Sequence, residues 1–348
     1  MEKKTIVVTG ASGYLGSWIV KTALDHGYTV RGTVRDPENE EKVGHLKELD
    51  GAKRLSLYQA DLLAAGAFDE AAKGADAIVH SASPYIVQNV EDGYKQLVEP
   101  AVEGTRNVLA AAGRAESVGR VVLTSSVVAI MGDAAEAKEY PDRVVDESRW
   151  NHTSTVQKSA YNYSKTAAEK EAWQIAGDHE AWDLIVINPA FIIGPSLSAR
   201  QDGTSVQLLK QLGDGTLKQG APGLVFGIVD VRDVALAHIN ALKPNVGPGR
   251  FILADKVRGF DDLAKTLHVE FGDRFQIPKR GIPKFLFWLA APSVGLERKY
   301  VSRNANIRFT LDNHRSRDIL GIDYRDVDAS VVEHFQQLVD QGAVKPAV

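Results

Sequence analysis

The chain contains no cysteine and no long hydrophobic run, and each absence excludes a class of protein. Without cysteine there is no disulfide and no thiolate ligand, and the nine histidines show no paired ligand spacing, so we expect no metal site. The absence fits a reducing compartment, and we expect a cytoplasmic protein. The longest apolar stretch, FLFWLAAPSVGL (285–296), contains a proline and is shorter than the ~20 residues of a spanning helix. We interpret it as core or pocket wall rather than a membrane-surface helix, and we expect no membrane partner.

An excess of positive charge is also missing. The chain has 41 Lys and Arg against 45 Asp and Glu, which gives a net charge of −4 and a pI near 6.2. Proteins that bind nucleic acid usually carry a basic field, so we expect no nucleic-acid partner. The 348 residues suffice for one large domain or for a main domain with a smaller lobe.

Short apolar runs alternate with amphipathic stretches over the first part of the chain. The predicted strands are 5–9, 29–34, 55–59, 77–81, 121–124 and 184–188, and the predicted helices are 15–25, 98–112, 161–176, 231–242 and 330–341. This order predicts the α/β class, with a doubly wound parallel sheet of the Rossmann type. Glycine and proline become frequent after about residue 190. We therefore expect a main domain over 1–190 and a smaller C-terminal substrate lobe over 191–348, with some segments returning to the main domain.

Three glycines, Gly10, Gly13 and Gly16, follow the first predicted strand in VVTGASGYLGSW. The first permits a tight turn, the second lets the backbone approach a pyrophosphate, and the third lets the following helix pack closely. The spacing is G-x-x-G-x-x-G rather than the commoner G-x-G-x-x-G, and ordinary turn glycines are the alternative. Because strand, turn and helix occur in the required order, we predict a dinucleotide-binding loop. It comprises Gly10, Ser12, Gly13, Tyr14, Leu15 and Gly16.

The end of the second strand, TVRDPENEEK, indicates which dinucleotide binds. An acidic side chain there would bond the ribose hydroxyls of NAD, whereas a basic one can pair with the 2′-phosphate of NADP. Arg35 is the basic candidate and Lys42 follows it, but Asp36 lies close to the position of the NAD acid. Because Asp36 precedes Pro37, we interpret it as the start of a turn. The basic residues favour NADPH, and solvated surface charges are the alternative.

The segment AYNYSKT (160–166) places two tyrosines close to one lysine. On a helix Tyr161 and Lys165 are i and i+4 and share a face, whereas Tyr163 points away. A nearby ammonium favours the phenolate and lowers the pKa of a tyrosine, so Tyr161 is the candidate acid. Tyr163 is then a packing or pocket residue. The Y-x-x-x-K spacing is common by chance and needs support from other motifs.

That support comes from RVVLTSSVVAI, an apolar strand that ends in Thr124, Ser125 and Ser126. Open α/β proteins bind ligands at the carboxyl edge of the sheet, so a serine there could hold a substrate carbonyl oxygen. The alternative is that these hydroxyls satisfy backbone groups at a strand end.

Together these segments resemble the extended short-chain dehydrogenases/reductases. The matching stretches run from about residue 5 to 242 and include TGASGYLGSW, GTVRDP, ADL, HSASP, VEPAVEGTRNVL, VVLTSS, VDESRW, YNYSK, INPAFIIGP and VDVRDVALAHI. Within that family the chain is similar to the dihydroflavonol 4-reductase and cinnamoyl-CoA reductase group and to its microbial aldehyde and ketone reductase relatives. Roughly the last hundred residues match loosely.

The resemblance implies reduction of an aldehyde or ketone with NADPH by a Ser-Tyr-Lys triad. It gives Ser126 as the hydroxyl that orients the carbonyl, Tyr161 as the proton donor, and Lys165 as the residue that binds the nicotinamide ribose and modulates Tyr161. It also implies cofactor contacts by Arg35 and Lys42 at the 2′-phosphate, Asp61 and Leu62 near adenine, Ser81, Ala82 and Ser83 along the cofactor, Thr124 and Ser125 at the strand end, and Pro189, Ala190 and Ile192 beside the nicotinamide.

Two other function classes stay open. A NAD-dependent nucleotide-sugar epimerase or dehydratase shares the fold and the triad, but would carry an acid where this chain has TVR. A non-catalytic, cofactor-sensing regulator would not need a complete triad.

Cinnamoyl-CoA reductases have a NWYCYGK-type segment where this chain has SAYNYSK, which argues against thioester reduction. We expect a small-molecule carbonyl substrate and a monomer or homodimer.

Overall fold

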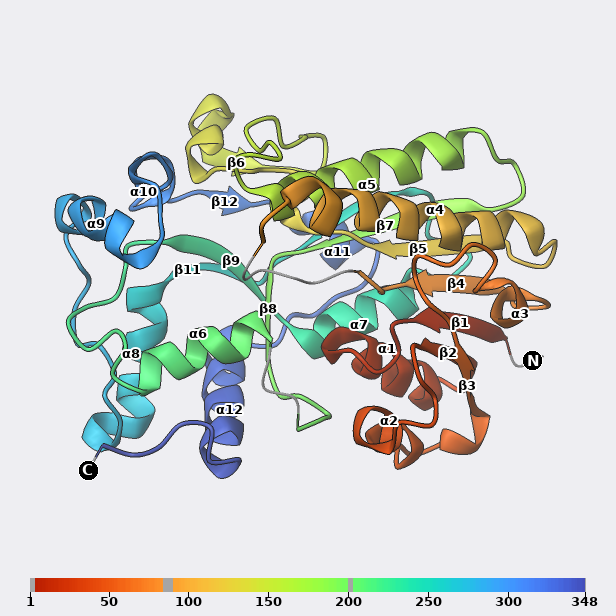
Figure 1. The fold of residues 1–348 in the computed structure, drawn as a ribbon, viewed down its shortest axis with the longest axis horizontal. Coiled ribbons are helices and arrows are strands. Elements are labelled where there is room, and N and C mark those ends of the chain that lie inside the picture. Colours follow the sequence, from red (N-terminus) through yellow and green to blue (C-terminus); the bar gives the residue numbers. More distant parts are fainter. Residues whose placement is uncertain (1–3, 84–89, 200–202, 348) are drawn as a thin grey trace.

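The computed structural model describes residues 4–83, 90–199 and 203–347, so Pro84 of HSASP and residues 200–202 lie outside the described part. Its centre is a seven-stranded sheet in the order β10-β7-β5-β4-β1-β2-β3, with all neighbours parallel (Figure 1). The strands are β1 (Thr5–Thr9), β2 (Thr29–Val34), β3 (Leu55–Gln59), β4 (Ala77–His80), β5 (Arg120–Thr124), β7 (Asp183–Pro189) and β10 (Gly249–Leu253). The strand order reverses at β1 and β4, whose carboxyl ends therefore flank the crevice where such sheets bind ligands.

Helices cover both faces of this sheet because its strands are apolar on both sides. Along β1, Ile6 and Val8 belong to the core under α1 and α7, whereas Val7 belongs to the core under α4 and α5. The helices of this part are α1 (Tyr14–Asp25), α2 (Glu40–Lys47), α3 (Asp69–Ala72), α4 (Glu99–Arg114), α5 (Ala160–Gly177) and α7 (Val231–Asn240). The two-sided core fixes the strands and the loops at their carboxyl ends.

A smaller lobe lies beside the carboxyl edge of the sheet (Figure 1). Its three-stranded sheet, in the order β11-β9-β8, packs against α6, α8 and α12 through a core that includes Leu209, Leu267 and Phe335. The elements of this part are β8 (Phe191–Ile193), α6 (Thr204–Gly213), β9 (Val225–Asp230), β11 (Lys256–Gly259), α8 (Phe260–Phe271) and α12 (Val327–Asp340). The remaining elements are β6 (Val144–Val145) paired with β12 (Thr310–Leu311), and the short helices α9 (Lys284–Ala290), α10 (Arg298–Asn304) and α11 (His314–Asp318).

The predicted fold class is confirmed. The strands predicted at 5–9, 29–34 and 55–59 have those bounds, and the other three differ by one residue at one or both ends. The helix predicted over 98–112 corresponds to α4, which begins at Glu99 after a π-helical turn over Tyr94–Val98. After residue 190, α7 and β10 return to the main sheet, so the chain crosses between the two parts more than once. The boundary at 190 stays a prediction.

The apolar stretch 285–296 differs from its interpretation as core. Phe287 and Ala291 are buried against α10, but Phe285, Trp288 and Leu289 are 65%, 36% and 54% exposed. Helix α9 is apolar around its circumference, and one face is enough to pack against its neighbour. The core interpretation is therefore wrong for the outward residues. Among the helices of the described residues, none has the length and hydropathy to cross a membrane.

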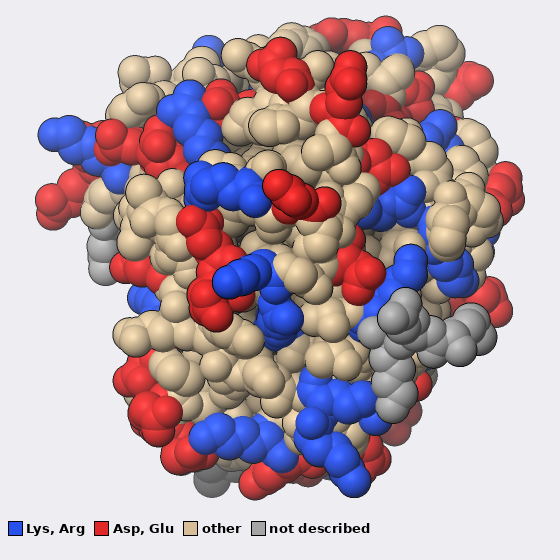
Figure 2. Space-filling model, turned by 90° about the vertical axis from the view of Figure 1, so that its right-hand side faces the viewer, with Lys and Arg blue, Asp and Glu red and all other residues tan. Residues whose placement is uncertain are grey.

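Lys and Arg are interspersed with Asp and Glu on the face that Figure 2 shows. This face lies at the amino ends of the strands of the main sheet, on the right of Figure 1. It is opposite the carboxyl edge, where the predicted site residues meet.

Candidate active site

The glycine turn links β1 to α1 and brings the backbone close to the end of β4. Gly10 has a φ of +67°, and a Cβ on it would lie 3.0 Å from Cα of Ala82. A Cβ on Gly16 would lie 2.1 Å from the carbonyl oxygen of Gly10, so a larger residue does not fit there. Gly13 is the N-cap of α1 and carries no side chain over the helix end. The turn therefore leaves room for an anionic pyrophosphate at the helix N-terminus.

The residues between these glycines have different surroundings. Ser12 lies partly exposed in the turn, and Leu15 packs against the core under α1. The Tyr14 hydroxyl donates to the Gly194 carbonyl at 2.7 Å, which ties α1 to the end of β8. Burial raises the pKa of Tyr14 well above its usual value, so this phenol stays protonated. Its hydroxyl thus serves a structural contact.

Hydrogen bonds hold the end of β4 against β1. The Ser81 hydroxyl donates to the Thr9 carbonyl at 2.6 Å, and the Ala82 N–H donates to Thr9 Oγ1 at 3.0 Å. Thr9 Oγ1 also bonds Nδ1 of His80 at 2.8 Å. Burial lowers the pKa of His80 to about 3, so the imidazole is neutral. These contacts fix the backbone that the predicted cofactor path follows.

Tyr161 and Lys165 lie on one face of α5, with Lys165 Nζ 5.9 Å from the centre of the Tyr161 ring. The same ammonium donates to Ser83 Oγ at 3.0 Å, so it joins α5 to the segment after β4. Burial lowers the pKa of Lys165 to about 8, although the nearby carboxylate of Glu169 opposes this shift. Lys165 is therefore mostly charged at pH 7, and its ammonium lies beside the Tyr161 ring.

Two of the three hydroxyls after β5 are engaged inside the protein. Thr124 Oγ1 bonds Nε2 of His238 at 2.7 Å, and Nδ1 of His238 bonds the Val234 carbonyl at 2.7 Å. Because a carbonyl can only accept, Nδ1 carries the proton and the Thr124 hydroxyl donates to Nε2. The Ser125 hydroxyl donates to the carboxylate of Glu169. Both hydroxyls therefore have a side-chain partner within the protein.

Ser126 differs from its two neighbours. Its hydroxyl makes two long contacts, donating to the Pro189 carbonyl at 3.4 Å and accepting from the Val128 N–H at 3.3 Å. Weak contacts of this length can be exchanged for a better one. Of the three, Ser126 is therefore the hydroxyl best suited to bind a substrate oxygen.

Glu169 is a buried hub that sequence reasoning missed. Its Oε2 accepts from Ser125 and from Asn188 Nδ2 (2.8 Å), and its Oε1 accepts from Arg250 Nε (2.6 Å). Asn188 Nδ2 also donates to the Ser126 carbonyl at 3.2 Å. The hub thus joins β5, α5, β7 and β10, and it holds α5 against the strand end that carries Ser126. Because Glu169 is four residues after Lys165, the sequence could have predicted that the two side chains share a helix face. Nothing in the sequence pointed to Arg250.

The predicted phosphate-binding residues lie at the end of β2 and on α2. Arg35 and Lys42 are both exposed, and among the described residues neither is paired with a carboxylate. Asp36 Oδ1 accepts from the N–H of Glu38 at 3.0 Å, as expected for a residue that begins a turn. Arg35 and Lys42 are thus the exposed cations at this edge, whereas the carboxylate of Asp36 accepts a hydrogen bond within its own turn.

The remaining predicted contacts follow β3 and β7. Asp61 is exposed and accepts from the N–H of Leu63 at 2.9 Å, and Leu62 packs against the core under α4. Pro189 ends β7, Ala190 follows it, and Ile192 lies in β8. The adenine-side and nicotinamide-side positions therefore lie along one edge of the sheet, on either side of the glycine turn.

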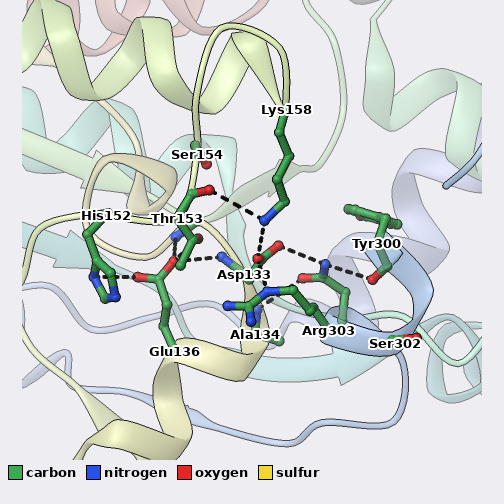
Figure 3. A network of polar contacts seen from close by, with 12 residues as sticks. Asp133, Ala134, Glu136, His152, Thr153, Ser154, Lys158, Tyr300, Ser302 and Arg303 are labelled. Carbon is green, nitrogen blue, oxygen red and sulfur yellow. Dashed lines mark hydrogen bonds and ion pairs between the residues drawn. The ribbon is translucent and has the colours of Figure 1, made fainter. Parts of the chain in front are cut away.

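A second polar network centres on the buried carboxylate of Asp133 (Figure 3). It accepts from Lys158 Nζ at 2.6 Å, from Arg303 Nε, and from Asn304 Nδ2 at 3.0 Å. Burial alone would raise the pKa of Asp133, but these three donors hold it below its usual value. Lys158 belongs to the loop before α5, whereas Arg303 and Asn304 belong to α10. The network therefore connects α10 to the loop that precedes Tyr161.

Comparison with known proteins identifies the family. Residues 6–254 match the model of the NAD dependent epimerase/dehydratase family. The chain belongs to this family. It is 40% identical to a cinnamoyl-CoA reductase of Medicago truncatula over 278 residues, which are 79% of this chain and 83% of the relative. It is 34% identical to a bifunctional dihydroflavonol 4-reductase/flavanone 4-reductase of Pyrus communis, with 80% of each chain covered.

A solved structure extends the similarity to the whole chain. The yeast methylglyoxal/isovaleraldehyde reductase Gre2, solved with NADPH, superposes with a TM-score of 0.77 and 28% identity over 98% of this chain and 100% of that one. The predicted resemblance to the extended short-chain dehydrogenases/reductases is confirmed.

Proposed function

We propose that the protein is a carbonyl reductase that converts an aldehyde or ketone into an alcohol, with Ser126, Tyr161 and Lys165 as its catalytic residues. The observation that carries the proposal is the geometry of α5, where Lys165 Nζ lies 5.9 Å from the Tyr161 ring centre. The long contacts of Ser126 and the reductase names of the relatives support it.

The cofactor is NADPH, and the residues present fit it. The cradle around Gly10 and Gly16, which a Cβ would fill, would hold the pyrophosphate. Arg35 and Lys42 would pair with the 2′-phosphate, and Lys165 would hold the nicotinamide ribose. When bound, the cofactor supplies the hydride. The proposed division of labour is that residues 1–190 mainly bind the cofactor and 191–348 mainly the substrate.

Three side chains would handle the substrate oxygen. Ser126 donates a hydrogen bond that orients the carbonyl, and Tyr161 gives its phenolic proton to the same oxygen as negative charge develops there. The carbon gains the hydride and the oxygen gains the proton, so the product is the neutral alcohol. The Lys165 ammonium stabilises the phenolate that Tyr161 becomes, and solvent returns the proton afterwards.

The position of Asp36 supports this proposal over a nucleotide-sugar epimerase. An epimerase with bound NAD would use an acid at the end of β2 to bond the ribose. Asp36 instead accepts from the N–H of Glu38, and the exposed Arg35 precedes it. This arrangement favours a phosphorylated ribose and a cofactor that is exchanged in each turnover.

The proposal is tested by NADPH consumption over a panel of carbonyl compounds. The panel contains methylglyoxal, isovaleraldehyde, aromatic aldehydes, a dihydroflavonol, cinnamoyl-CoA and a nucleotide sugar. We expect turnover of apolar aldehydes or ketones, and no nucleotide retained by the purified protein. Retained NAD, with turnover of the nucleotide sugar alone, would support the epimerase instead.

A further inference from the structure

Exposed apolar side chains gather on α9 and the turn after it. Figure 1 shows α9 at the outer end of the lobe. Nine large hydrophobic residues are exposed in the described part of the chain, and four of them are scattered. The other five, here called the α9 surface, are Phe285, Leu286, Trp288, Leu289 and Val294. Single exposed apolar residues are ordinary, whereas a cluster of this kind marks a contact surface.

The α9 surface is held on a rigid support. Phe287 and Ala291 face inward and pack against Val301 of α10 and against Ala305 after it. Lys284 Nζ donates to the carbonyls of Ser302 (3.0 Å) and Ala305 (2.8 Å), which fastens the start of α9 to the end of α10. The inward face of α9 therefore packs against α10, and the residues of the outward face are not part of that core.

The same segment is strongly basic. Residues 279–303 contain six basic residues and one acidic residue, a local charge of +5 (six minus one) in a chain of net charge −4. Lys279 and Arg303 have carboxylate partners; within the described ranges no carboxylate is paired with Arg280, Arg298 or Lys299. Three cations without a carboxylate partner in the described part of the chain therefore belong to the same segment as the apolar residues.

One of these cations lies directly on the apolar surface. The Arg298 guanidinium is 4.6 Å from the centre of the Trp288 ring. A long basic side chain that lies along an aromatic ring can keep its charge at a polar boundary while the ring enters an apolar one. The α9 surface therefore has an apolar face and a charged rim.

We propose that the α9 surface docks on an anionic lipid membrane, with its apolar side chains in the interface and Arg280, Arg298 and Lys299 against acidic headgroups. Trp, Phe and Leu beside Lys and Arg are the usual composition of segments that lie in the plane of a membrane interface. We expected no membrane partner because 285–296 was interpreted as core or pocket wall rather than as a membrane-surface helix. The exposure of Phe285, Trp288 and Leu289 reopens the membrane-surface alternative.

A second copy of the chain fits the α9 surface less well than an anionic membrane does. In a two-fold dimer the same patch meets itself, so Arg280, Arg298 and Lys299 of one copy would face the same three cations of the other. Like charges across an interface oppose association. An anionic bilayer instead complements both the charge and the apolar face.

The test is co-sedimentation of the full chain with vesicles of phosphatidylcholine, alone or with phosphatidylserine. We expect at least tenfold stronger binding to the anionic vesicles and weaker binding as salt rises. Phe285→Ser/Leu289→Ser and Arg298→Gln/Lys299→Gln should each weaken binding at least tenfold. Val269→Ser and Lys4→Gln/Lys345→Gln make matched changes at exposed positions elsewhere and should leave binding unchanged. Thermal melting checks that each variant is folded.

Three results would overturn the proposal. The first is binding that is absent, or equal in the α9 variants and the controls. The second is a wild-type dimer, seen by analytical ultracentrifugation, that the α9 variants dissociate, because the surface would then join two copies. The third is a KM for apolar carbonyls that is higher in the α9 variants than in the wild type when no vesicles are present, because the surface would then be a wall of the substrate pocket. Reductase activity of the wild type is measured separately, so failure here leaves the proposed function untouched.

Discussion

The guanidinium of Arg250 lies 2.6 Å, Nε to Oε1, from the carboxylate of Glu169, and both side chains are buried. Glu169 is one helical turn after Lys165 on α5, whereas Arg250 enters from β10, 81 positions later in the chain. Arg250 also donates to the Glu147 carbonyl at 2.8 Å. A strand from the C-terminal half thus holds the helix that carries Tyr161, the proposed proton donor.

Removing Arg250 should destabilise the protein strongly. Arg250→Met leaves the Glu169 carboxylate buried without its cation, and losing one partner of a buried pair costs about 3–5 kcal/mol. Unfolding in urea measures this loss. The double variant Glu169→Gln/Arg250→Met should lose less than Arg250→Met, because no charge is left unpaired. Equal losses in the two variants would mean that Arg250 acts through packing on the Trp150 ring, 4.0 Å away, and not through the ion pair.

Asp133→Asn should also destabilise, and the effect should depend on pH. The variant weakens charge-assisted hydrogen bonds from Lys158 and Arg303, at a cost of about 1.5–3 kcal/mol at neutral pH. The folded pKa of Asp133 is below its unfolded value of 3.8, so its contribution is present above that value and lost as pH falls through the folded pKa. Urea unfolding at pH 7 and at low pH measures the gap between wild type and variant. A gap that does not shrink in acid would contradict the assignment.

Local patterns predicted the elements that position the site. Six of the seven strands of the main sheet were predicted from short runs between turn residues, as at 29–34, and β10 was not. The i,i+4 spacing of Tyr161 and Lys165 needs nothing beyond the helix to bring the two side chains to one face. Ser126 could be chosen from TSS by resemblance alone; the structure adds the reason that Thr124 and Ser125 already have partners.

Contacts between distant segments could not be predicted in this way. Arg250 reads as one more charged residue in a strand, and only the pairing of β10 with β7 brings it to Glu169. The outward residues of α9 were interpreted as core or pocket wall, because hydrophobicity alone does not say whether a packing partner exists on both faces of a helix. Asp133 and Arg303 are 170 positions apart, and no periodicity links them.

Arg35→Ala should change the choice of cofactor. Arg35 is exposed and is proposed to pair with the 2′-phosphate, so its loss should raise KM for NADPH at least tenfold and leave NADH nearly unaffected. Initial rates with both cofactors measure the ratio. Arg280→Ala, which removes an exposed arginine at the other end of the molecule, is the control. Equal effects on NADPH and NADH would refute the assignment.

The rate should fall as pH rises through the pKa of Lys165. This pKa is about 8, and a base holds its proton below its pKa, so the ammonium is present at pH 7 and lost above pH 8. The profile of kcat/KM against pH should therefore bend downward near 8. Glu169 raises this pKa, so Glu169→Gln should move the bend to lower pH. In Lys165→Arg the cation does not titrate, and a bend that stays near pH 8 would rule out Lys165 as its source.

Tyr161→Phe and Tyr163→Phe should have very different effects. Tyr161→Phe keeps the ring and removes the acid that protonates the substrate oxygen, and general acid catalysis of this kind contributes ~10²–10⁴ in rate. Tyr163 is two residues before Lys165 and lies on another face of α5, so Tyr163→Phe should cost much less. The measurement is kcat on a good aldehyde with saturating NADPH.

Lys165→Met completes the comparison, because it separates the acid from the group that supports it. The variant should lower kcat less than Tyr161→Phe and should also weaken NADPH binding, since the ammonium is proposed to serve both the phenol and the ribose. Cofactor binding followed by quenching of protein fluorescence keeps the two roles apart: Tyr161→Phe should bind NADPH almost as tightly as wild type. If Tyr163→Phe lowered kcat more than Tyr161→Phe, the proton would come from the other face of α5, and the triad would have to be reassigned.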